Sequence, residues 1–382
     1  MAISNEDDSQ SENNRKQARK QFGIIMLRSF AKKFGVDTTT NTKHTTTGDE
    51  AKVDKNQPKR RALGDITNST NVTNAADAAK DAISFKKSTV FSLETAKNND
   101  ETASTSSVDN ERSYMQRPAD DIDARDIGNP LLCTQYVNEM YDHYNEVERQ
   151  FMVKDYISKQ QHVNERMRTI LVDWLVEVHL KFKMVPETLY LSVNLIDRYL
   201  EKKQVRRSKL QLVGVAALSL AAKYEEIYPP ELRELVYITD KAYNKAEVVE
   251  MESDIVNTLE YNLTVPTIHT FLCRYLKAAH ADRTMVQLAC YIAERTLQEY
   301  SMVKYLPSVI AATSVLIARK SLKRNPWSPT LVNYTKYDEC DLVACNNDIG
   351  SFINDETIQQ QAVAKKYSSP KFGSVAKMTA LL

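Results

Sequence analysis

The pattern of apolar and polar residues changes near residue 120. Before that point apolar residues are sparse among Ser, Thr, Asn, Asp and Lys, with one Tyr, Tyr114, and no Trp. After it, the other 18 tyrosines and both tryptophans appear, and apolar residues recur at steps of three and four, the period of an amphipathic helix. Too few apolar side chains precede residue 119 to offset the entropy of ordering. The pattern therefore predicts a disordered tail over residues 1–118, followed by an all-α region.

One stretch of the tail, residues 22–34, has apolar residues at helical spacing. They are Phe22, Ile25, Met26, Phe30 and Phe34. The spacing is compatible with a transient helix or a short recognition element, and a locally apolar patch without a role is the alternative.

Prolines and capping residues predict where the later helices begin and end. Helices are expected over residues 130–144, 167–183, 186–198, 210–226 and 245–261, with starts marked by Pro130, Asn164, Pro186 and Asn244. The turns between them are short, which favours antiparallel packing in a bundle.

A shift of 97 residues superimposes much of the helical region on itself. Asp197 and Arg198 fall on Glu294 and Arg295, and two further helices match at the same offset, while the last helix matches better at 94. A single offset that keeps three helices in register indicates a duplicated unit of about 95 residues, and so two domains rather than a solenoid.

The repeat and the change of pattern divide the chain into five parts. These are the tail over 1–118, an N-terminal helix and connection over 119–165, a first bundle over 166–263, a second bundle over 264–357 and a C-terminal tail over 358–382. The final residues, 375–382, are compatible with a loose tail or a last helix.

Two helices of the first bundle have unusual compositions. The helix over 210–226 carries the small residues Gly214, Ala216, Ala217, Ala221 and Ala222. Neighbouring helices can approach such a helix closely, so we expect it to be the buried axis. The helix over 167–183 is apolar nearly all round, so it is either fully buried or leaves an apolar stripe exposed for a partner.

Charge, cysteine and motif content exclude several classes of protein. Lys and Arg number 51 and Asp and Glu 50, which argues against direct binding of nucleic acid by bulk charge. The longest apolar stretch, over 213–222, is about half the length of a membrane span. Five cysteines without a Cys-x-x-Cys pair favour a reducing compartment, nucleus or cytosol. The six histidines lack metal-ligand spacing, and no P-loop or nucleophile elbow occurs, so we expect no metal, no cofactor and no catalysis.

Two motifs resemble those of the cyclin family, and within it the mitotic B type. Residues 167–178, MRTILVDWLVEV, resemble the signature that opens the cyclin box, and residues 223–230, KYEEIYPP, resemble the end of its third helix. The resemblance extends over about 121–353. It implies two tandem five-helix bundles and a regulatory subunit, not an enzyme, that binds and activates a cyclin-dependent kinase at the G2/M transition and in mitosis, in nucleus and cytoplasm.

The resemblance also implies which residues bind the kinase. Lys223 and Glu252 match the pair that hydrogen-bonds the backbone of the kinase C-helix, and Tyr224 matches an aromatic residue beside that pair. Tyr136 and Met140, four apart on the first helix, match its kinase-facing side. The alternative for Lys223 is a lysine that complements the carboxyl end of its own helix.

The apolar stripe of the helix over 167–183 matches the family's docking patch for short substrate motifs. Its residues are Met167, Ile170, Leu171 and Trp174, with Glu177 and Gln211 beside them. The alternative is that the four apolar residues belong to the core.

A segment of the tail resembles the destruction box that the anaphase-promoting ubiquitin ligase reads. Its residues are Arg60, Leu63, Ile66 and Asn68. Arg-x-x-Leu alone is weak evidence, because it recurs at 168–171 and 207–210, but there it lies within or beside predicted helices. A nuclear import signal over 59–61 is an alternative for the basic residues.

One rival function comes from another class of protein. General transcription factor IIB also has two cyclin-like bundles, so a scaffold in a nucleic-acid-bound transcription assembly is the alternative. That family would bring a Cys-x-x-Cys zinc ribbon and a basic groove, and this sequence has neither.

Overall fold

The helix starts of the first bundle follow from the capping residues. In the computed structural model, Asn164 Oδ1 accepts the backbone N–H of Met167 at 3.0 Å and begins α5 (Glu165–Phe182). Pro186 is the first residue of α6 (Pro186–Lys202). Asn244 forms a capping box with Glu247 at the start of α9 (Lys245–Thr258). Both asparagine side chains satisfy backbone N–H groups that the first helical turn leaves without a partner.

The structure describes residues 118–129, 132–325, 327–353 and 361–378. Within these ranges it is helical and contains no strand, which confirms the all-α class. The tail over 1–117, with the segment over 22–34, lies outside the described residues.

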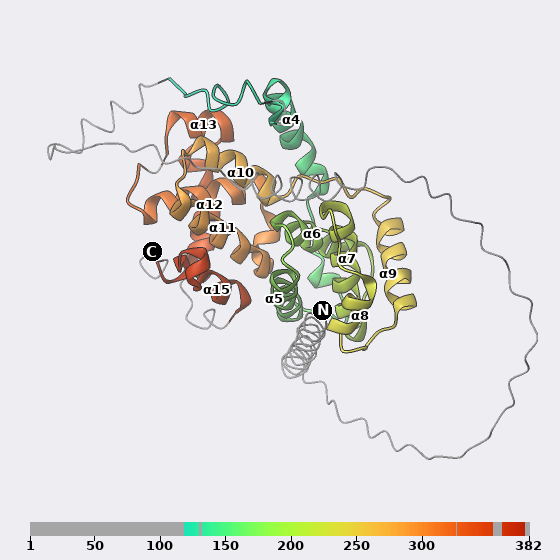
Figure 1. Cartoon of the computed structure of the whole chain (residues 1–382). Helices are drawn as coiled ribbons and strands as arrows, with labels where there is room; N and C mark the ends of the chain where they lie inside the picture. Colours follow the sequence, from blue (N-terminus) through green and yellow to red (C-terminus); the bar gives the residue numbers. More distant parts are fainter. Residues whose placement is uncertain (1–117, 130–131, 326, 354–360, 379–382) are drawn as a thin grey trace, which may run out of the picture. The chain divides into compact units, whose positions relative to one another are not determined.

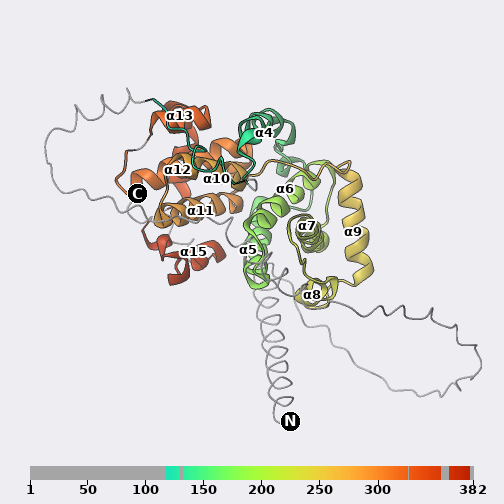
Figure 2. The same cartoon turned by 45° about the horizontal axis from the view of Figure 1, so that its top comes forward.

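Helix α7 (Leu210–Glu225) is the buried axis of the first bundle, as its small residues predict. Every residue from Leu210 to Ala222 is buried. Figure 2 shows α7 nearly end-on, with α5, α6, α8 (Leu232–Ile238) and α9 around it. A Cβ atom on Gly214 would lie 2.7 Å from Cδ1 of Leu171 on α5. The absence of a side chain at Gly214 therefore lets α5 approach α7 closely.

The second bundle repeats the first helix by helix (Figure 1). It consists of α10 (Ile268–Ala278), α11 (Arg283–Gln298), α12 (Pro307–Ser321), α13 (Pro329–Thr335) and α14 (Val343–Ile353). The starts of α6, α7 and α8 recur 97 residues later as the starts of α11, α12 and α13. This agreement confirms the duplicated unit and the two five-helix bundles.

Several helix ends differ from the sequence prediction, among them that of α9, which lies at Thr258 and not near residue 261. Helix α4 (Thr134–Val147) begins four residues after Pro130. Its N-cap residue, Cys133, has a left-handed backbone with a φ of 48°. Pro130 itself lies outside the described residues. Helix α6 runs one turn beyond the predicted end at Arg198, because Tyr199 and Leu200 continue its buried face.

The two acids that match in the repeat, Asp197 on α6 and Glu294 on α11, are both buried, and each is paired with a cation from a different helix. Asp197 receives two hydrogen bonds from Arg168 on α5, at 2.7 and 2.6 Å. Glu294 instead receives the ammonium of Lys366 at 2.7 and 2.8 Å and the hydroxyl of Tyr367 at 2.7 Å. Burying a carboxylate is costly unless it is paired, so the second bundle depends on the C-terminal residues.

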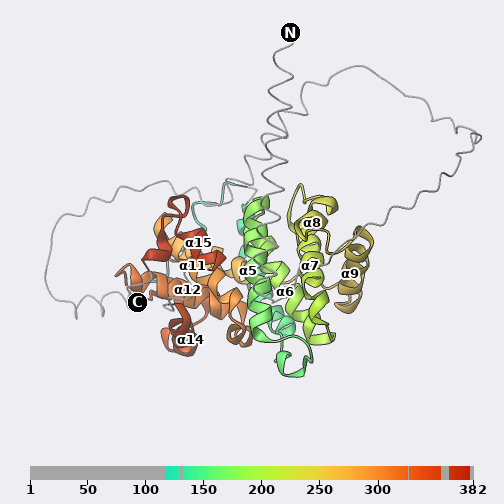
Figure 3. The same ribbon diagram turned by 90° about the horizontal axis from the view of Figure 1, so that it is seen from below.

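These C-terminal residues form α15 (Ala362–Tyr367), which packs on α11 and α5 (Figure 3). The backbone N–H of Ala362 donates to Asp173 Oδ1 at 2.6 Å, and Val363 is fully buried. For residues 375–382 the sequence is compatible with a loose tail or a last helix. The structure has a short 3-10 helix there, at Val375–Lys377, with Val375 buried. Residues 379–382 lie outside the description.

Arg168 also joins the two bundles. Its Nη1 donates to the backbone carbonyl of Leu297 at 2.9 Å, and the hydroxyl of the next residue, Thr169, donates to the carbonyl of Gln298 at 2.9 Å. Both carbonyls lie at the end of α11, so two consecutive residues of α5 satisfy groups that the helix end leaves without an intrahelical partner.

The close packing at Gly214 predicts that one added methyl group substantially lowers the free energy of unfolding. We expect Gly214→Ala to destabilise the protein by about 1–3 kcal/mol, because the added carbon overlaps the fully buried Leu171 side chain. Urea denaturation measures the change. Gly350→Ala on α14 is the matched control, since a Cβ there meets nothing within 4 Å and should stabilise the helix by up to about 1 kcal/mol. Equal effects of the two substitutions would contradict the close approach of α5 and α7.

Candidate functional site

Lys223 is the first residue of α7 to leave the core. The side chain before it, Ala222, is buried, whereas the Lys223 side chain is 51% exposed. Its ammonium lies 2.9 Å from Oε2 of Glu252 on α9, whose side chain is 10% exposed. The ion pair joins the last turn of α7 to α9 and has one solvent-exposed and one nearly buried partner.

The two members of the pair differ in what a partner can reach. Oε1 of Glu252 is buried, and among the described residues none donates a hydrogen bond to it, at a cost of roughly 1–3 kcal/mol. The ammonium of Lys223 is half exposed and has three N–H groups, and it donates to Oε2 of Glu252. The ammonium could therefore donate to a docked backbone as well.

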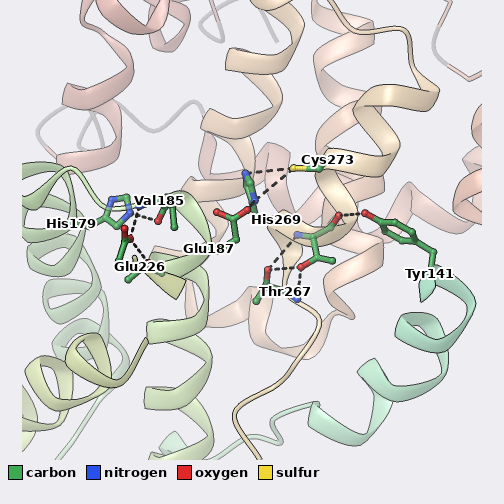
Figure 4. Close-up of polar contacts among 10 residues, drawn as sticks. Tyr141, His179, Val185, Glu187, Glu226, Thr267, His269 and Cys273 are labelled. Carbon is green, nitrogen blue, oxygen red and sulfur yellow. Dashed lines mark hydrogen bonds and ion pairs between the residues drawn. The ribbon is translucent and has the colours of Figure 1, made fainter. Parts of the chain in front are cut away.

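The chain just after Lys223 is held by the carboxylate of Glu226. Its Oε1 accepts the backbone N–H of Val185 and the hydroxyl of Thr188, both at 2.7 Å, at the start of α6 (Figure 4). His179 of α5 also contacts this point, since its Nε2 lies 2.8 Å from the Val185 carbonyl. These contacts fix the position of the segment that follows the ion pair.

Exposed apolar side chains surround the pair in the sequence. Tyr224 follows Lys223 directly and is about half exposed, as is Val249, which lies three residues before Glu252 on one face of α9. The others are Ile227, Tyr228 and Tyr261. Exposed apolar residues beside charged ones are typical of a protein-binding site.

Sequence reasoning did not single out Val249, Ile227, Tyr228 or Tyr261. For Val249 a signal was present, because it is an apolar residue on the same helix face as the buried Glu252. For the other three, exposure depends on how the loops after α7 and α9 run, and periodicity does not predict that.

Tyr136 and Met140 lie exposed and one turn apart on α4, a different element from the ion pair. The hydroxyl of Tyr141, the residue after Met140, donates to the carbonyl of Thr270 on α10 at 3.0 Å. Helix α4 is thus fixed to the second bundle, while Lys223 and Glu252 belong to the first.

The six residues matched to the docking patch do not lie equally open. Met167, Ile170 and Glu177 are half-buried, and Leu171, Trp174 and Gln211 are buried. Leu171 points at Gly214 of α7, so this residue belongs to the core, as the alternative interpretation expects. The more accessible part of the stripe is its Met167 and Ile170 edge.

The residues matched to the destruction box, 60–68, lie outside the described residues. The two other Arg-x-x-Leu sequences are described. Arg168 and Leu171 are buried within α5, and Leu210 is buried at the start of α7. A reader that grips an extended segment has no access to these leucines.

The described residues contain neither a metal-binding cluster nor a membrane-spanning helix. No group of three or more His, Cys, Asp or Glu side chains there could hold a metal ion. None of the helices described is both long and apolar enough to span a lipid bilayer.

Comparison with known proteins gives the family. Residues 139–264 match the family model of the cyclin N-terminal domain, and residues 266–381 match that of the cyclin C-terminal domain. Cyclin-B2-1 of Oryza sativa subsp. japonica is 46% identical over 260 residues, which cover 67% of this chain and 62% of that protein. The G2/mitotic-specific cyclin-B of Marthasterias glacialis is 45% identical over 265 residues, which cover 69% and 68%.

A solved structure agrees in fold. The X-ray structure of a viral cyclin from herpesvirus saimiri superposes with a TM-score of 0.50 at 22% identity, covering 56% of this chain and 96% of that one. The match spans about three fifths of the length of the rice relative. Cyclins are regulatory subunits of kinases and have no catalytic activity of their own. This chain belongs to the cyclin family, with B-type, G2/mitotic-specific cyclins among its relatives.

Proposed function

We propose that this chain binds and activates a cyclin-dependent kinase, and that the Lys223–Glu252 pair is where it holds the kinase. The observation that supports this most is the half-exposed ammonium of Lys223 beside the carboxylate of Glu252, at the point where α7 leaves the core. The ammonium has three N–H groups, so it can donate to a docked backbone carbonyl as well as to Glu252.

The mechanism follows from what a kinase needs for catalysis. A protein kinase is active only when the glutamate of its C-helix forms an ion pair with the lysine of its third strand. Glu252 would accept a backbone N–H of the C-helix, and Lys223 would donate to a backbone carbonyl. Hydrogen bonds to charged groups contribute about 1.5–3 kcal/mol each. The pair would thereby hold the C-helix in its active position without any catalytic group on this chain.

The apolar residues near the pair add area to the contact. Tyr224 and Val249 lie next to Lys223 and Glu252 in their helices, and both present exposed apolar surface. Docking would remove this surface from water, at about 25 cal/mol per Å², and would exclude water from the charged hydrogen bonds, which strengthens them.

Lys223→Ala is the direct test of the kinase-binding site. We expect binding of a mitotic cyclin-dependent kinase to weaken about 10–150-fold, because one charge-assisted hydrogen bond is lost, with a parallel loss of histone phosphorylation at limiting concentration. Titration of the kinase with purified protein measures both.

Lys209→Ala is the matched control. Lys209 Nζ lies 2.8 Å from Glu247 Oε1 and joins the starts of α7 and α9, as Lys223 and Glu252 join their later turns. Loss of this pair should leave kinase activation unchanged. Equal losses in both variants, or no loss in Lys223→Ala, would contradict the assignment. Thermal unfolding of each variant separates binding from stability.

We further propose that the complex acts at the G2/M transition and in mitosis, in nucleus and cytoplasm, and that the chain is then destroyed through residues 60–68. Support comes from the B-type relatives and from the motif Arg60, Leu63, Ile66 and Asn68. The anaphase-promoting ubiquitin ligase would be the reader, and the basic residues at 59–61 are an alternative import signal.

The double variant Arg60→Ala, Leu63→Ala should be stable where the original protein is degraded. In a cell-cycle extract at mitotic exit, we expect its half-life to increase several-fold, because the reader loses both anchors of the motif. Arg61→Ala is the control, since it removes the same charge without touching the Arg-x-x-Leu pair. Unchanged turnover of the double variant would refute the assignment.

We also propose that the Met167 and Ile170 edge of α5, with Glu177, docks short substrate motifs. Support comes from the half-buried apolar side chains beside an acid, a combination that suits a peptide with apolar and basic residues. Leu171 is buried, so it would support this edge only by its packing in the core.

Ile170→Ala should separate docking from activation. We expect it to raise the KM of the activated kinase for a protein substrate about 5–30-fold, from loss of about 1–2 kcal/mol of apolar contact. The KM for a short peptide that contains only the phosphorylated site should not change. Leu180→Ala, at another exposed apolar residue of α5, is the control. Equal effects on protein and peptide would contradict docking at this edge.

No observation favours the alternative function, a scaffold in a nucleic-acid-bound transcription assembly. The relatives compared above carry the names of cyclins, and a chain with a net charge of +1 lacks a bulk electrostatic attraction to DNA.

A further inference from the structure

A cysteine, a histidine and a glutamate meet where α6 and α10 contact each other (Figure 4). His269 and Cys273 lie one turn apart on α10, and Glu187 lies in the first turn of α6. Nδ1 of His269 is 3.2 Å from Oε1 of Glu187. The sulfur of Cys273 is 3.7 Å from Nδ1 and 3.8 Å from Nε2 of the same ring. This cluster plays no part in the proposed kinase contact.

The histidine of the cluster carries a positive charge. Its side chain is 13% exposed, and burial alone would lower its pKa. Cys273 and Glu187 together outweigh burial and raise the pKa of His269 well above its ordinary value. These neighbours therefore favour the protonated form of the ring, which lies in contact with the sulfur and a carboxylate.

The start of α10 holds this imidazolium in place. Thr267 and Thr270 form a capping box, and Tyr141 donates to the carbonyl of Thr270 (Figure 4). His269 lies between the two threonines in the sequence, so its backbone is fixed from both sides. The ring also packs against that of Tyr190, with centroids 5.7 Å apart.

Other titratable groups face the cluster from each neighbouring element. They are Tyr141 on α4, Glu187 and Tyr190 on α6, Arg274 on α10, Cys290 and Glu294 on α11, and Lys366 on α15. His269 contacts the sulfur, whereas Arg274 pairs with Asp123 at 2.6 Å and Lys366 pairs with Glu294 at 2.7 Å.

The cysteines differ in how far a reagent can reach them. Cys290 is partly buried, as Cys273 is, and burial raises the pKa of its thiol. Burial likewise raises the pKa of Cys345 to about 11. Cys273 is only partly buried, and Cys340 is exposed beside the carboxylate of Asp341. Cys273 thus combines access with a neighbouring cation, the environment in which cysteines become reactive.

We propose that Cys273 is a modification site, whose sulfur acts as a nucleophile beside His269 while Glu187 orients the histidine ring. A nucleophile within reach of a histidine that a third group orients is the arrangement that activates thiols in proteins. With an alkylating reagent, the sulfur forms a bond to carbon and the halide leaves. With a hydroperoxide, the sulfur attacks one oxygen and the O–O bond breaks. Cys273 is oxidised to a sulfenic acid, and the leaving hydroxide takes the proton of His269 and departs as water.

Site-resolved alkylation tests this directly. The full chain is treated with iodoacetamide at pH 6.5, and mass spectrometry gives the rate at each cysteine. We expect Cys273 to react about tenfold faster than the more exposed Cys340, because a neighbouring histidine activates the sulfur of Cys273, whereas Cys340 lies beside a carboxylate. Dimedone labelling after hydrogen peroxide should show the same order.

Two variants separate activation from simple exposure. His269→Gln removes the cation and should reduce the rate at Cys273 to that of Cys340 or below. Glu187→Gln keeps the size of the side chain and should lower the rate several-fold, which covers the case in which His269→Gln fails to fold. Cys273→Ser confirms the labelled position. A rate at Cys273 no greater than at Cys340 in the original protein, or a rate unchanged in Glu187→Gln, would overturn the proposal.

Discussion

The close packing around α7 is the constraint on which the rest of this structure depends. A helix buried on all sides can have neighbours at short distance only if its side chains are small, and Gly214 has no room for even one more carbon beside Leu171. That packing fixes where α7 leaves the core. Lys223 is therefore held at a defined point of the surface, and α9 places Glu252 against it. A rigid, buried helix presents the charged pair with less loss of entropy on binding than a loop would.

The second bundle uses the same plan with a different source of charge. The equivalent acids Asp197 and Glu294 are both buried, yet Arg168 of α5 neutralises the first and Lys366 of α15 neutralises the second. Duplication preserved the acid but not the position of its partner. As a result α15 is required by the core, and α5 serves both bundles through Arg168 and its contact with the carbonyl of Leu297.

Local signals were sufficient to predict much of this fold. Asn164, Pro186 and Asn244 mark helix starts because their effect depends on the nearest backbone groups, and the 97-residue offset predicted the second bundle. The predicted helix ends were wrong where an unusual backbone or a longer buried face decided them. Cys133 begins α4 in a left-handed conformation that Pro130 does not signal. The spacing of apolar residues on α5 predicts which of them share a helix face, but it does not predict which helix that face packs against. It therefore could not show that Leu171 points at Gly214. The Lys223–Glu252 pair was named from family resemblance, and neither spacing nor composition would have joined residues on two helices.

A structure of this chain bound to a mitotic cyclin-dependent kinase would test the proposed role of the Lys223–Glu252 pair. We expect the kinase C-helix to lie against the ends of α7 and α9, with its backbone hydrogen-bonded to the Glu252 carboxylate and the Lys223 ammonium. A complex in which the kinase attaches elsewhere, and the Lys223–Glu252 pair faces solvent, would contradict it.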